Sequence, residues 1–441
     1  MLTRLLHCAQ GCVVICIQFI VKVRREVVIP ERVIIVGAGI VGVSTGIWLQ
    51  RFSDADVTII DRLPPGEGTS HGNAGVIAAC SVAPVTAPGL VRKAPGMLMN
   101  PDFPLFMRWG YFPKLLPWLL KYLSNANDSD TRRISKGLTT IVADSVDQHK
   151  AMVANTSAAG WVQDCDYSFA YKDRAAFEGD AYTWGLRRDA GFEPVLREGP
   201  EAREYEPNLS PDVGLLATMQ DHAFIRDPGG YVKALAAVFE ALGGEIVQAE
   251  IKDFELTDDR ITGVVTDQGR KPCDRTVLAT GVWSKPMMKK LGLFIPIETE
   301  RGYHIIWKDA TGGPSHPIMV ASGKFVATPM AAGLRCAGVV EFGGLDAGAS
   351  KAALDLLRKQ AKAAFPNLEA AEEIEWLGHR PAPSDSLPLI GEVRATGIYT
   401  AFGHHHIGLT GGAKTGRIVA GLVANQPTNT DIGAFDPMRF A

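Results

Sequence analysis

The chain has 441 residues, of which 46% are hydrophobic, so it can bury a large core and fold as two domains. Its formal net charge is −3 and its isoelectric point is about 6.4, and the absence of any long basic run excludes a typical nucleic-acid-binding protein. Seven cysteines are scattered mostly singly, without the spacing of a disulfide framework or a zinc site, which favours a reducing, cytoplasmic compartment.

Residues 1–30 form an unusual start. The segment from Leu5 to Val23 is mostly apolar, but Gln10 and Gln18 interrupt it, and it is short for a membrane span, which needs roughly 20 apolar residues. No convincing signal-peptide cleavage site follows it. We interpret residues 1–30 as an extension outside the fold, with peripheral contact to the inner face of the membrane as the alternative.

The most informative motif is V-I-I-V-G-A-G-I-V-G at residues 33–42, with Asp61 at the end of the next apolar run. A buried strand followed by Gly37, Gly39 and Gly42 and then by a helix is typical of a dinucleotide site. The glycines permit a tight turn, close approach of a pyrophosphate and close packing of the helix that begins with Ile40 and Val41, while the acid accepts the ribose hydroxyls. The alternative is an ordinary glycine-rich turn between a strand and a helix.

Periodicity predicts the elements that follow. Apolar spacing indicates helices over 131–160, 231–242, 349–365 and 413–424, the second ended by Gly243-Gly244 and the third by Pro366. Strands are expected at 245–256 and 261–267, then a buried strand running into a glycine turn at 275–284, and an antiparallel sheet over 301–345.

Segments that resemble cofactor-binding elements lie at the start, middle and end of the chain, which indicates interleaved domains. We therefore predict an α/β fold in which a Rossmann-like FAD-binding domain is interleaved with an α+β substrate domain that contains a mainly antiparallel sheet. The predicted FAD-binding segments are 31–85, 218–300 and 376–441, and the predicted substrate-domain segments are 86–217 and 301–375.

Two observations favour FAD over a nicotinamide dinucleotide. The glycine fingerprint occurs once, whereas an enzyme that reduces a flavin with NAD(P)H usually carries a second copy. The segment V-L-A-T-G-V-W-S at 277–284, which contains Thr280, Gly281 and Trp283, has the strand and glycine turn that flavoproteins place beside the pyrophosphate. With FAD bound and no nicotinamide site, the substrate itself is expected to donate the hydride.

Five segments together resemble the D-amino acid oxidase/glycine oxidase family of FAD enzymes, and most of all the bacterial D-amino acid dehydrogenases of the small-subunit type. They are the fingerprint at 33–42, T-S-H-G-N-A-G at 69–75, V-L-A-T-G-V-W-S at 277–284, H-R-P-A-P-S-D-S-L-P-L-I-G at 379–391 and F-G-H-H-H-I-G-L-T-G-G-A-K-T-G-R at 402–417. Only the last two are distinctive individually, but the order and spacing of all five are similar to those of the family.

The resemblance implies further cofactor-binding residues. The 69–75 loop is expected to run along the flavin through Thr69, Ser70, Asn73, Ala74 and Gly75, and the helix after a 408–412 loop to aim its N-terminus at the pyrimidine edge through Gly408, Leu409 and Thr410. Arg62 and Ile251 match weaker positions on the adenosine side. Some related dehydrogenases link FAD covalently through a histidine, but His71 stands one residue too early, so non-covalent FAD is predicted.

The resemblance also implies candidates for the substrate site. Arg380, in the R-P motif, is the predicted clamp for an amino-acid carboxylate, with a surface salt bridge or a structural pair with Asp385 as the alternative. Tyr303 is either an active-site hydroxyl or a packed aromatic residue. Arg335 is a second clamp or the partner of Glu341 in a strand ion pair.

His405 is a fourth candidate, together with its neighbour His406, because either ring is expected to line the pocket. Three consecutive histidines, His404 to His406, rarely converge on one ion, so no metal site is predicted.

The resemblance implies oxidative deamination of an amino acid, with D-amino acids preferred. Hydride leaves Cα for flavin N5, and the imino acid is hydrolysed to a 2-oxo acid and ammonia. The expected electron acceptor is a quinone or another carrier, with oxygen as the main rival. Glycine, sarcosine, proline or hydroxyproline as substrate, and a non-catalytic flavoprotein subunit, are the alternatives; the oligomeric state stays open.

Overall fold

The apolar run of the glycine fingerprint forms the central strand of a parallel sheet. The computed structural model describes residues 31–441, and in it β1 (Arg32–Val36) pairs in parallel with β2 (Asp56–Asp61) and β12 (Arg275–Leu278). The sheet continues with β8 (Glu245–Gln248) beside β2, and with β19 (Ile398–Phe402) and then an antiparallel edge strand, β18 (Leu389–Glu392), beside β12. The N-terminal extension predicted at 1–30 lies outside the described residues.

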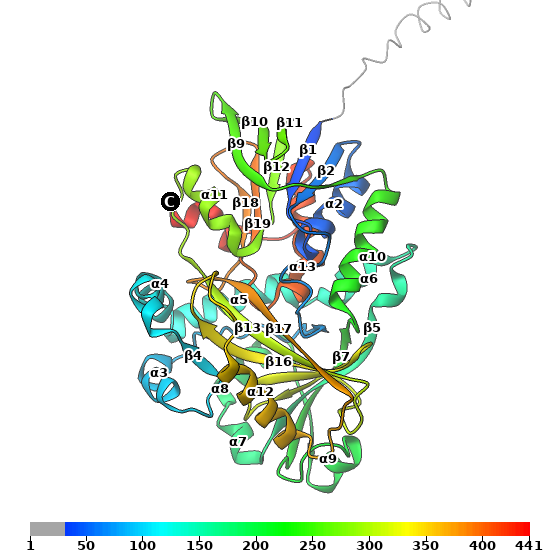
Figure 1. The fold of residues 1–441 in the computed structure, drawn as a ribbon, viewed down its shortest axis with the longest axis vertical. Helices are drawn as coiled ribbons and strands as arrows, with labels where there is room; N and C mark the ends of the chain where they lie inside the picture. The colour runs from blue at the N-terminus through cyan, green and yellow to red at the C-terminus, as the bar shows by residue number, and fades with distance from the viewer. Residues whose placement is uncertain (1–30) are drawn as a thin grey trace, which may run out of the picture. The chain divides into compact units, whose positions relative to one another are not determined.

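Both faces of this sheet are covered, as its continuous apolar strands require. Val33 and Ile35 of β1 face α2 (Ile40–Phe52), α10 (Pro228–Ala241) and α13 (Gly408–Val423). Their neighbours Ile34 and Val36 face the other way, because successive side chains of a strand alternate. That second face is covered by an antiparallel sheet of β9 (Ile251–Thr257), β10 (Arg260–Thr266) and β11 (Gly269–Pro272), as Figure 1 shows.

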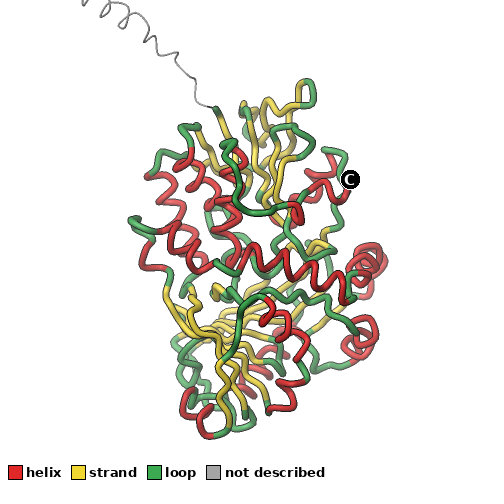
Figure 2. Tube along the Cα trace, turned by 180° about the vertical axis from the view of Figure 1, so that it is seen from behind, coloured by secondary structure: helices red, strands yellow, loops and turns green. Residues whose placement is uncertain are grey.

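A larger sheet of ten strands lies in the lower half of Figures 1 and 2. It is mainly antiparallel; β14 with β5 and β16 with β4 are its parallel pairs. Its strands are β3 (Val76–Ile77), β4 (Leu105–Met107), β5 (Gln163–Tyr171), β6 (Val195–Glu198), β7 (Leu215–Phe224), β13 (Ile297–Lys308), β14 (Ile318–Val320), β15 (Phe325–Met330), β16 (Gly333–Phe342) and β17 (Glu372–Pro383). α12 (Lys351–Ala364) packs its apolar face against β13 and β16. The α/β class with two such sheets confirms the predicted fold.

Helices between β3 and β7 cover the rest of the larger sheet and its junction with the parallel sheet. They are α3 (Leu90–Met99), α4 (Phe112–Ser124), α5 (Asp128–Val142), α6 (Ser145–Val153), α7 (Arg174–Glu178), α8 (Ala181–Asp189) and α9 (Pro200–Tyr205); α11 (Ser284–Lys290) follows β12. Among residues 31–441, no helix combines the length and apolar character needed to cross a membrane.

The structure corrects two of the predicted elements and confirms two others. The helix expected over 131–160 is two helices, because the chain turns at Asp144, whose carboxylate pairs with Lys414 of α13. The strand expected over 245–256 divides between two sheets, β8 and β9, since the Ala249 N–H donates to the Asp61 carbonyl at the edge of β2. The helices expected at 231–242 and 349–365 are confirmed as α10 and α12.

The predicted domain boundaries fall inside strands of the larger sheet. The boundary at 217/218 lies within β7, the one at 300/301 within β13 and the one at 375/376 within β17. All strands of the parallel sheet, by contrast, come from segments assigned to the FAD-binding domain. The division into domains stays a prediction, and its boundaries would have to move to the ends of these strands.

Close packing of α13 on α2 gives a test of the cofactor-side core. A Cβ at Gly416 would lie 2.6 Å from the Ser44 carbonyl carbon, whereas a Cβ at Gly421 of the same helix meets nothing within 4 Å. We expect Gly416→Ala to lower the free energy of unfolding by about 1–3 kcal/mol, because the two helices must separate. Gly421→Ala is expected to leave it unchanged or raise it by up to about 1 kcal/mol. Thermal or urea unfolding of both variants measures the difference, and equal effects would contradict the packing argument.

Candidate functional site

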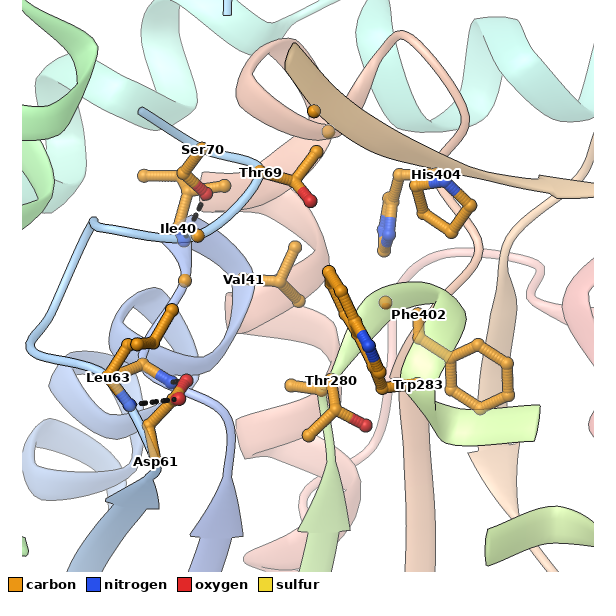
Figure 3. Close-up of a pocket in the computed structure, with 18 of the residues that line it drawn as sticks. Ile40, Val41, Asp61, Leu63, Thr69, Ser70, Thr280, Trp283, Phe402 and His404 are labelled. Carbon is orange, nitrogen blue, oxygen red and sulfur yellow. Dashed lines mark hydrogen bonds between the residues drawn. The ribbon is translucent and has the colours of Figure 1, made fainter. Parts of the chain in front are cut away.

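One cavity of about 330 Å³ runs from the carboxyl ends of the parallel strands to the face of β13 and β17. At one end lie Val36, Asp61 and Leu278, and at the other Gly302 and Arg380. Ligands of open α/β sheets bind outside the carboxyl ends of the strands, so the position is the expected one for a dinucleotide. Figure 3 shows part of this cavity, with Asp61 and Thr280 at one side and His404 at the other.

The predicted site residues that line the cavity are Gly39, Ile40, Val41, Asp61, Arg62, Thr69, Ser70, Asn73, Ile251, Thr280, Gly281, Trp283, Tyr303, Arg380, His405, Gly408 and Leu409. Those that do not line it are Gly37, Gly42, Ala74, Gly75, Arg335 and Thr410. The structure therefore brings together residues that lie more than 300 positions apart in the chain, from the fingerprint to the start of α13.

The fingerprint glycines divide into packing and lining positions. Gly37 has a φ of +114°, and a Cβ there would lie 2.6 Å from the Ala279 carbonyl oxygen; a Cβ at Gly42 would lie 1.9 Å from the Gly37 carbonyl oxygen. These two glycines let the turn and the helix pack closely. Gly39 faces the cavity at the N-cap of α2 and has no side chain of its own to cap the helix, although Ser70 accepts the Ile40 N–H. The other N–H groups of this helix N-terminus suit a negatively charged phosphate.

Asp61 is held in place by two backbone N–H groups. The Ala38 N–H donates to Oδ2 at 2.7 Å and the Leu63 N–H donates to Oδ1 at 3.0 Å, the latter drawn in Figure 3. The carboxylate stands at the end of β2 with further lone pairs available to ribose hydroxyls. Beside it, the Arg62 guanidinium lies 4.7 Å from the centre of the Trp283 ring, a cation–π contact that gives this end of the cavity a flat wall.

Four consecutive carbonyls attach the 69–75 loop to the larger sheet. Arg335 Nη1 donates to the His71 oxygen at 3.0 Å and to the Asn73 oxygen at 2.6 Å. His304 Nδ1 contacts the Gly72 oxygen at 3.2 Å, and Thr328 Oγ1 donates to the Ala74 oxygen at 2.8 Å. Such a row of bonds holds the loop in one shape before any ligand arrives. Arg335 therefore acts on the loop and not at the cavity wall.

The ends of this loop are constrained as well. Thr69 Oγ1 donates to the His379 carbonyl at 3.0 Å, and Asn73 Oδ1 accepts the Gly75 N–H at 2.9 Å. Gly75 has a φ of +80°, and a Cβ there would lie 2.5 Å from the Ile225 carbonyl oxygen, so glycine is required at this turn. At the other end, Ser70 Oγ accepts the Ile40 N–H at 3.1 Å, which ties the loop to the first turn of α2 (Figure 3).

Trp376 forms a wall of the cavity that the sequence analysis did not identify. Its ring stacks on His304, with centres 5.0 Å apart, and rests on two glycines. A Cβ at Gly72 would lie 1.8 Å from the ring and one at Gly378 1.9 Å from it. Trp376, Gly378 and Arg380 are every second residue of β17, and every second residue of a strand faces the same side. The position of Trp376 could therefore have been predicted from that of Arg380.

The segment 408–412 is helical, which corrects the predicted loop. α13 begins at Gly408, and Gly408 and Leu409 line the cavity with the helix N-terminus. Thr410 Oγ1 accepts the Ala78 N–H at 3.3 Å, so its side chain joins α13 to the segment after β3. The positive end of the helix dipole thus points at the cavity and stabilises negative charge there.

Arg380 is buried in the cavity wall. Its guanidinium donates to the carbonyls of Val339 at 3.2 Å and Gly338 at 3.4 Å, and it rests on Gly302, where a Cβ would lie 2.4 Å from Cζ. Two of its five N–H groups are used in this way, which leaves donors for a carboxylate. Burial lowers the pKa of Arg380, and nearby Glu300 opposes that shift.

The structural alternative for Arg380 is not formed. Asp385 pairs with Arg439 at 2.7 Å instead of with Arg380. The alternative for Arg335 is also wrong, because Glu341 pairs with Arg301 at 2.9 Å and with Arg108 at 3.1 Å.

Tyr303 is a packed aromatic residue with a bound hydroxyl. Its OH donates to Glu341 Oε2 at 2.5 Å and accepts the Ser350 N–H at 3.0 Å. Its side chain leaves β13 on the face opposite to Glu300 and Gly302, since neighbouring residues of a strand alternate. The residue borders the cavity, but the hydroxyl serves the Arg301–Glu341 network. The geometry thus favours the packed-aromatic interpretation of Tyr303.

The three consecutive histidines have different partners. His404 Nε2 contacts Thr415 Oγ1 at 2.9 Å, and burial lowers the pKa of His404 to about 4. His405 Nε2 lies 2.6 Å from Glu300 Oε2, and His406 lines the cavity. Among residues 31–441 no group of three or more His, Cys, Asp or Glu side chains is arranged to hold a metal ion.

These residues fit a bound FAD. The N-terminus of α2, with glycine at its N-cap, suits a pyrophosphate, and the acid held at the end of β2 suits a ribose. The flat Arg62–Trp283 wall suits an adenine, and the second helix dipole at the far end suits a flavin that gains negative charge on reduction. The fold and the cavity together are those of an FAD-dependent oxidoreductase. The role of each single residue stays a prediction.

Comparison with known proteins also identifies an FAD-dependent oxidoreductase. Residues 32–422 match the DAO family model, described as FAD dependent oxidoreductase, and the chain belongs to this family. It is 37% identical over 421 residues to a D-amino-acid oxidase of Bradyrhizobium diazoefficiens, covering 93% of this chain and 100% of the relative. It is 29% identical to a D-amino acid dehydrogenase of Sinorhizobium medicae, covering 91% and 97%. A solved L-proline dehydrogenase from P. horikoshii superimposes with a TM-score of 0.71 at 20% identity, covering 93% and 98%.

The carbonyl bonds of Arg335 give a test of the loop. We expect Arg335→Met to raise the dissociation constant for FAD about 10- to 100-fold, because two charge-assisted bonds to the 69–75 loop are lost. Fluorescence titration of apo-protein with FAD measures this constant. Arg203→Met, at an exposed position of α9, is the matched control. Unchanged affinity in Arg335→Met would contradict the anchoring role.

Proposed function

We propose that this protein catalyses the oxidative deamination of a D-amino acid. The observation that carries the proposal is Arg380, a buried guanidinium with free donors in the wall of the cavity where the substrate carboxylate would bind. A planar, permanently charged fork is the natural partner of a carboxylate. Two relatives that match almost the whole chain are named for D-amino acids, one as an oxidase and one as a dehydrogenase, which supports the D configuration.

The chain's own residues bind, orient and shield the substrate. Arg380 fixes the carboxylate. Its guanidinium packs directly on Gly302, which holds it in one position. Trp376 and the apolar wall exclude water, so that the electrostatic interactions inside are strong. FAD, when bound, supplies the acceptor for the hydride that leaves Cα. The start of α13 stabilises the negative charge that follows from this transfer.

The cofactor is proposed to be non-covalent. The His71 side chain lies against α10, since a Cβ at Gly229 would be 2.7 Å from its Nδ1, and His71 is not among the cavity-lining residues. A covalent link from this ring would require the loop to turn over. Flavin that stays with acid-precipitated protein would contradict this assignment.

The proposed reaction is tested by anaerobic mixing with a panel of D- and L-amino acids, glycine, sarcosine and proline. Bleaching of the flavin absorbance is expected with D-amino acids. Arg380→Ala should raise KM about 100-fold or more, since loss of a buried charge pair costs roughly 3 kcal/mol, while FAD stays bound. The KM of Arg380→Lys should lie between that of the wild type and that of Arg380→Ala. Bleaching by L-amino acids or proline alone would give the site another substrate, and no bleaching with any amine would favour a non-catalytic flavoprotein.

The electron acceptor is proposed to be a quinone reached at a membrane surface. α3 and α4 lie together at one edge of Figures 1 and 2, and this part of the chain exposes apolar side chains. Met99 of α3 is 85% exposed, Trp109 in the 3₁₀ turn before α4 is 66% exposed and Leu120 of α4 is 61% exposed. Between residues 68 and 127 Asp102 is the single acidic residue. An apolar surface with bases and almost no acids fits an anionic lipid layer.

This surface lies directly behind the substrate site. The inner side of α4 is buried, with Trp118 Nε1 donating to the Ala382 carbonyl at 2.9 Å, two residues after Arg380. Electrons taken up in the cavity would therefore have a short path to this edge. Oxygen is the second candidate acceptor, because the 37% identical relative is named an oxidase.

Vesicle binding tests the surface. The protein is expected to sediment with vesicles containing anionic lipid and not with neutral ones. Lys114→Glu/Lys121→Glu, on the exposed side of α4, should reduce the bound fraction at least about 10-fold, since each base near an anionic surface contributes roughly 1 kcal/mol. Lys289→Glu/Lys362→Glu, elsewhere on the surface, carries the same charge change as a control. Equal binding of both variants, with hydrogen peroxide formed in air, would support the oxidase.

A further inference from the structure

A buried carboxylate lies beside the proposed substrate clamp. Glu300 of β13 stands directly opposite Arg380 of β17, and only 5% of it is exposed. Its Oε2 is 2.6 Å from His405 Nε2. A buried acid is costly unless charged or hydrogen-bonded groups compensate it, so this pair needs an explanation. Binding of a substrate carboxylate explains why Arg380 is buried at this position, but it does not explain the Glu300–His405 pair.

The pair is connected to the cavity through a second histidine. His405 Nδ1 lies 3.3 Å from His406 Nδ1, and the two rings meet edge to face at 4.8 Å. His406 lines the cavity, and it is solvent-exposed although protein surrounds its ring. The backbone holds this arrangement, because the His405 N–H donates to the Pro381 carbonyl at 2.9 Å.

Hydrogen bonding limits where the protons can be. With the proton of a neutral His405 on Nε2, the ring nitrogen 2.6 Å from Glu300, its Nδ1 can accept a hydrogen bond from His406 Nδ1. His406 then presents an unprotonated Nε2 as its remaining ring nitrogen. A zwitterionic amino acid that binds Arg380 through its carboxylate brings an α-ammonium group into the same cavity. Hydride cannot leave Cα with the nitrogen lone pair occupied by a proton, so this ammonium must first lose one.

We propose, on the basis of the proposed function, that His406, His405 and Glu300 form a relay that takes the proton from the substrate's α-ammonium group. The N–H bond of the ammonium breaks, its electron pair stays on nitrogen, and the proton binds His406 Nε2. The proton on His406 Nδ1 passes to His405 Nδ1, which leaves His406 neutral and His405 an imidazolium paired with Glu300. His406 is the catalytic residue of this step, and His405 and Glu300 are positioning residues.

The charges of the site balance before and after the transfer. The empty site contains Arg380 as a cation and Glu300 as an anion. With substrate bound and the proton moved, Arg380 pairs with the substrate carboxylate and the His405 imidazolium pairs with Glu300. No uncompensated charge is left in the cavity in either state, which a site of low polarity requires.

The groups around the relay fix Glu300 as its anion. Burial tends to raise the pKa of Glu300, but His405, Arg380 and His406 outweigh it and keep the pKa below its ordinary value, so Glu300 is the anion. Burial, with His405 and Arg380, lowers the pKa of His406 to about 3, so the proton does not stay there. Tyr122 of α4 also faces Glu300, and its pKa is raised well above the ordinary value, which keeps it neutral.

The test is the pH dependence of kcat/KM in the FAD-loaded enzyme. With Glu300→Gln, His405 cannot store the proton, and only substrate molecules that are already deprotonated react. At pH 7, kcat/KM should fall about 100-fold, and the deficit should shrink about 10-fold per pH unit toward the pKa of the free substrate ammonium. His406→Phe should show the same shift. D-Trifluoroalanine, whose ammonium is far more acidic, should react with both variants nearly as fast as with wild type.

A matched control separates this effect from loss of a buried acid in general. Glu206 is 1% exposed and lies 3.3 Å from His316 in another Glu–His pair, remote from the cavity lining. Glu206→Gln should leave the pH profile unchanged. A pH-independent loss in Glu300→Gln, or no rescue by D-trifluoroalanine, would overturn the relay. Failure of wild type to be reduced by any D-amino acid would instead overturn the proposed function.

Discussion

The antiparallel pairing of β13 with β17 is the constraint on which the rest of the site depends. Its register sets Glu300 opposite Arg380, Gly302 opposite Gly378 and His304 opposite Trp376. The four side chains of this set leave the same face, because opposite residues of an antiparallel pair share a face. The glycines make room for the guanidinium and the indole, so that large polar and aromatic groups lie flat in a dense wall. A slip of one residue would turn the entire set away from the cavity.

The second constraint is the attachment of the 69–75 loop to this same sheet. Arg335, His304 and Thr328 bind its carbonyls, and Thr69 binds the strand that carries Arg380. Burial lowers the pKa of Arg335 to about 10 and nearby Asp227 opposes the shift, so the guanidinium keeps its charge at neutral pH. The two sheets are thereby coupled at the cavity. The FAD side and the substrate side cannot move independently without breaking these bonds.

Polar groups at the cavity also divide by function according to which face of β13 they occupy. Arg301 and Tyr303 leave one face and build a network with Glu341 that supports the segment up to Ser350. Glu300 and Gly302 lie on the other face, opposite Arg380 and Gly378 of β17. The similarity between R-G-Y-H and the family segment cannot distinguish these faces, so the sequence leaves Tyr303 open between an active-site hydroxyl and a packed aromatic residue and does not indicate Glu300.

Much of the FAD side of the site was predictable because its signals are local. A glycine required by a positive φ, an acid at a strand end and a helix start are separated by few residues, and their roles follow from backbone geometry. The elements around them were predicted for the same reason. Errors occurred where a tertiary contact decided the outcome: Asp144 with Lys414 divides one helix, and the Ala249 N–H bonded to Asp61 divides one strand.

The sequence by itself determined the fold class and the FAD family and predicted a carboxylate clamp at Arg380, since all three depend on short motifs with strong steric or electrostatic requirements. Only the tertiary structure decided that Arg335 binds a loop instead of Glu341, that Trp376 forms a wall, and that Glu300 meets His405. Those contacts join residues tens to hundreds of positions apart across strand pairs and loops. Their partners are chosen by register and face, and neither leaves a signal in the composition or spacing of one segment.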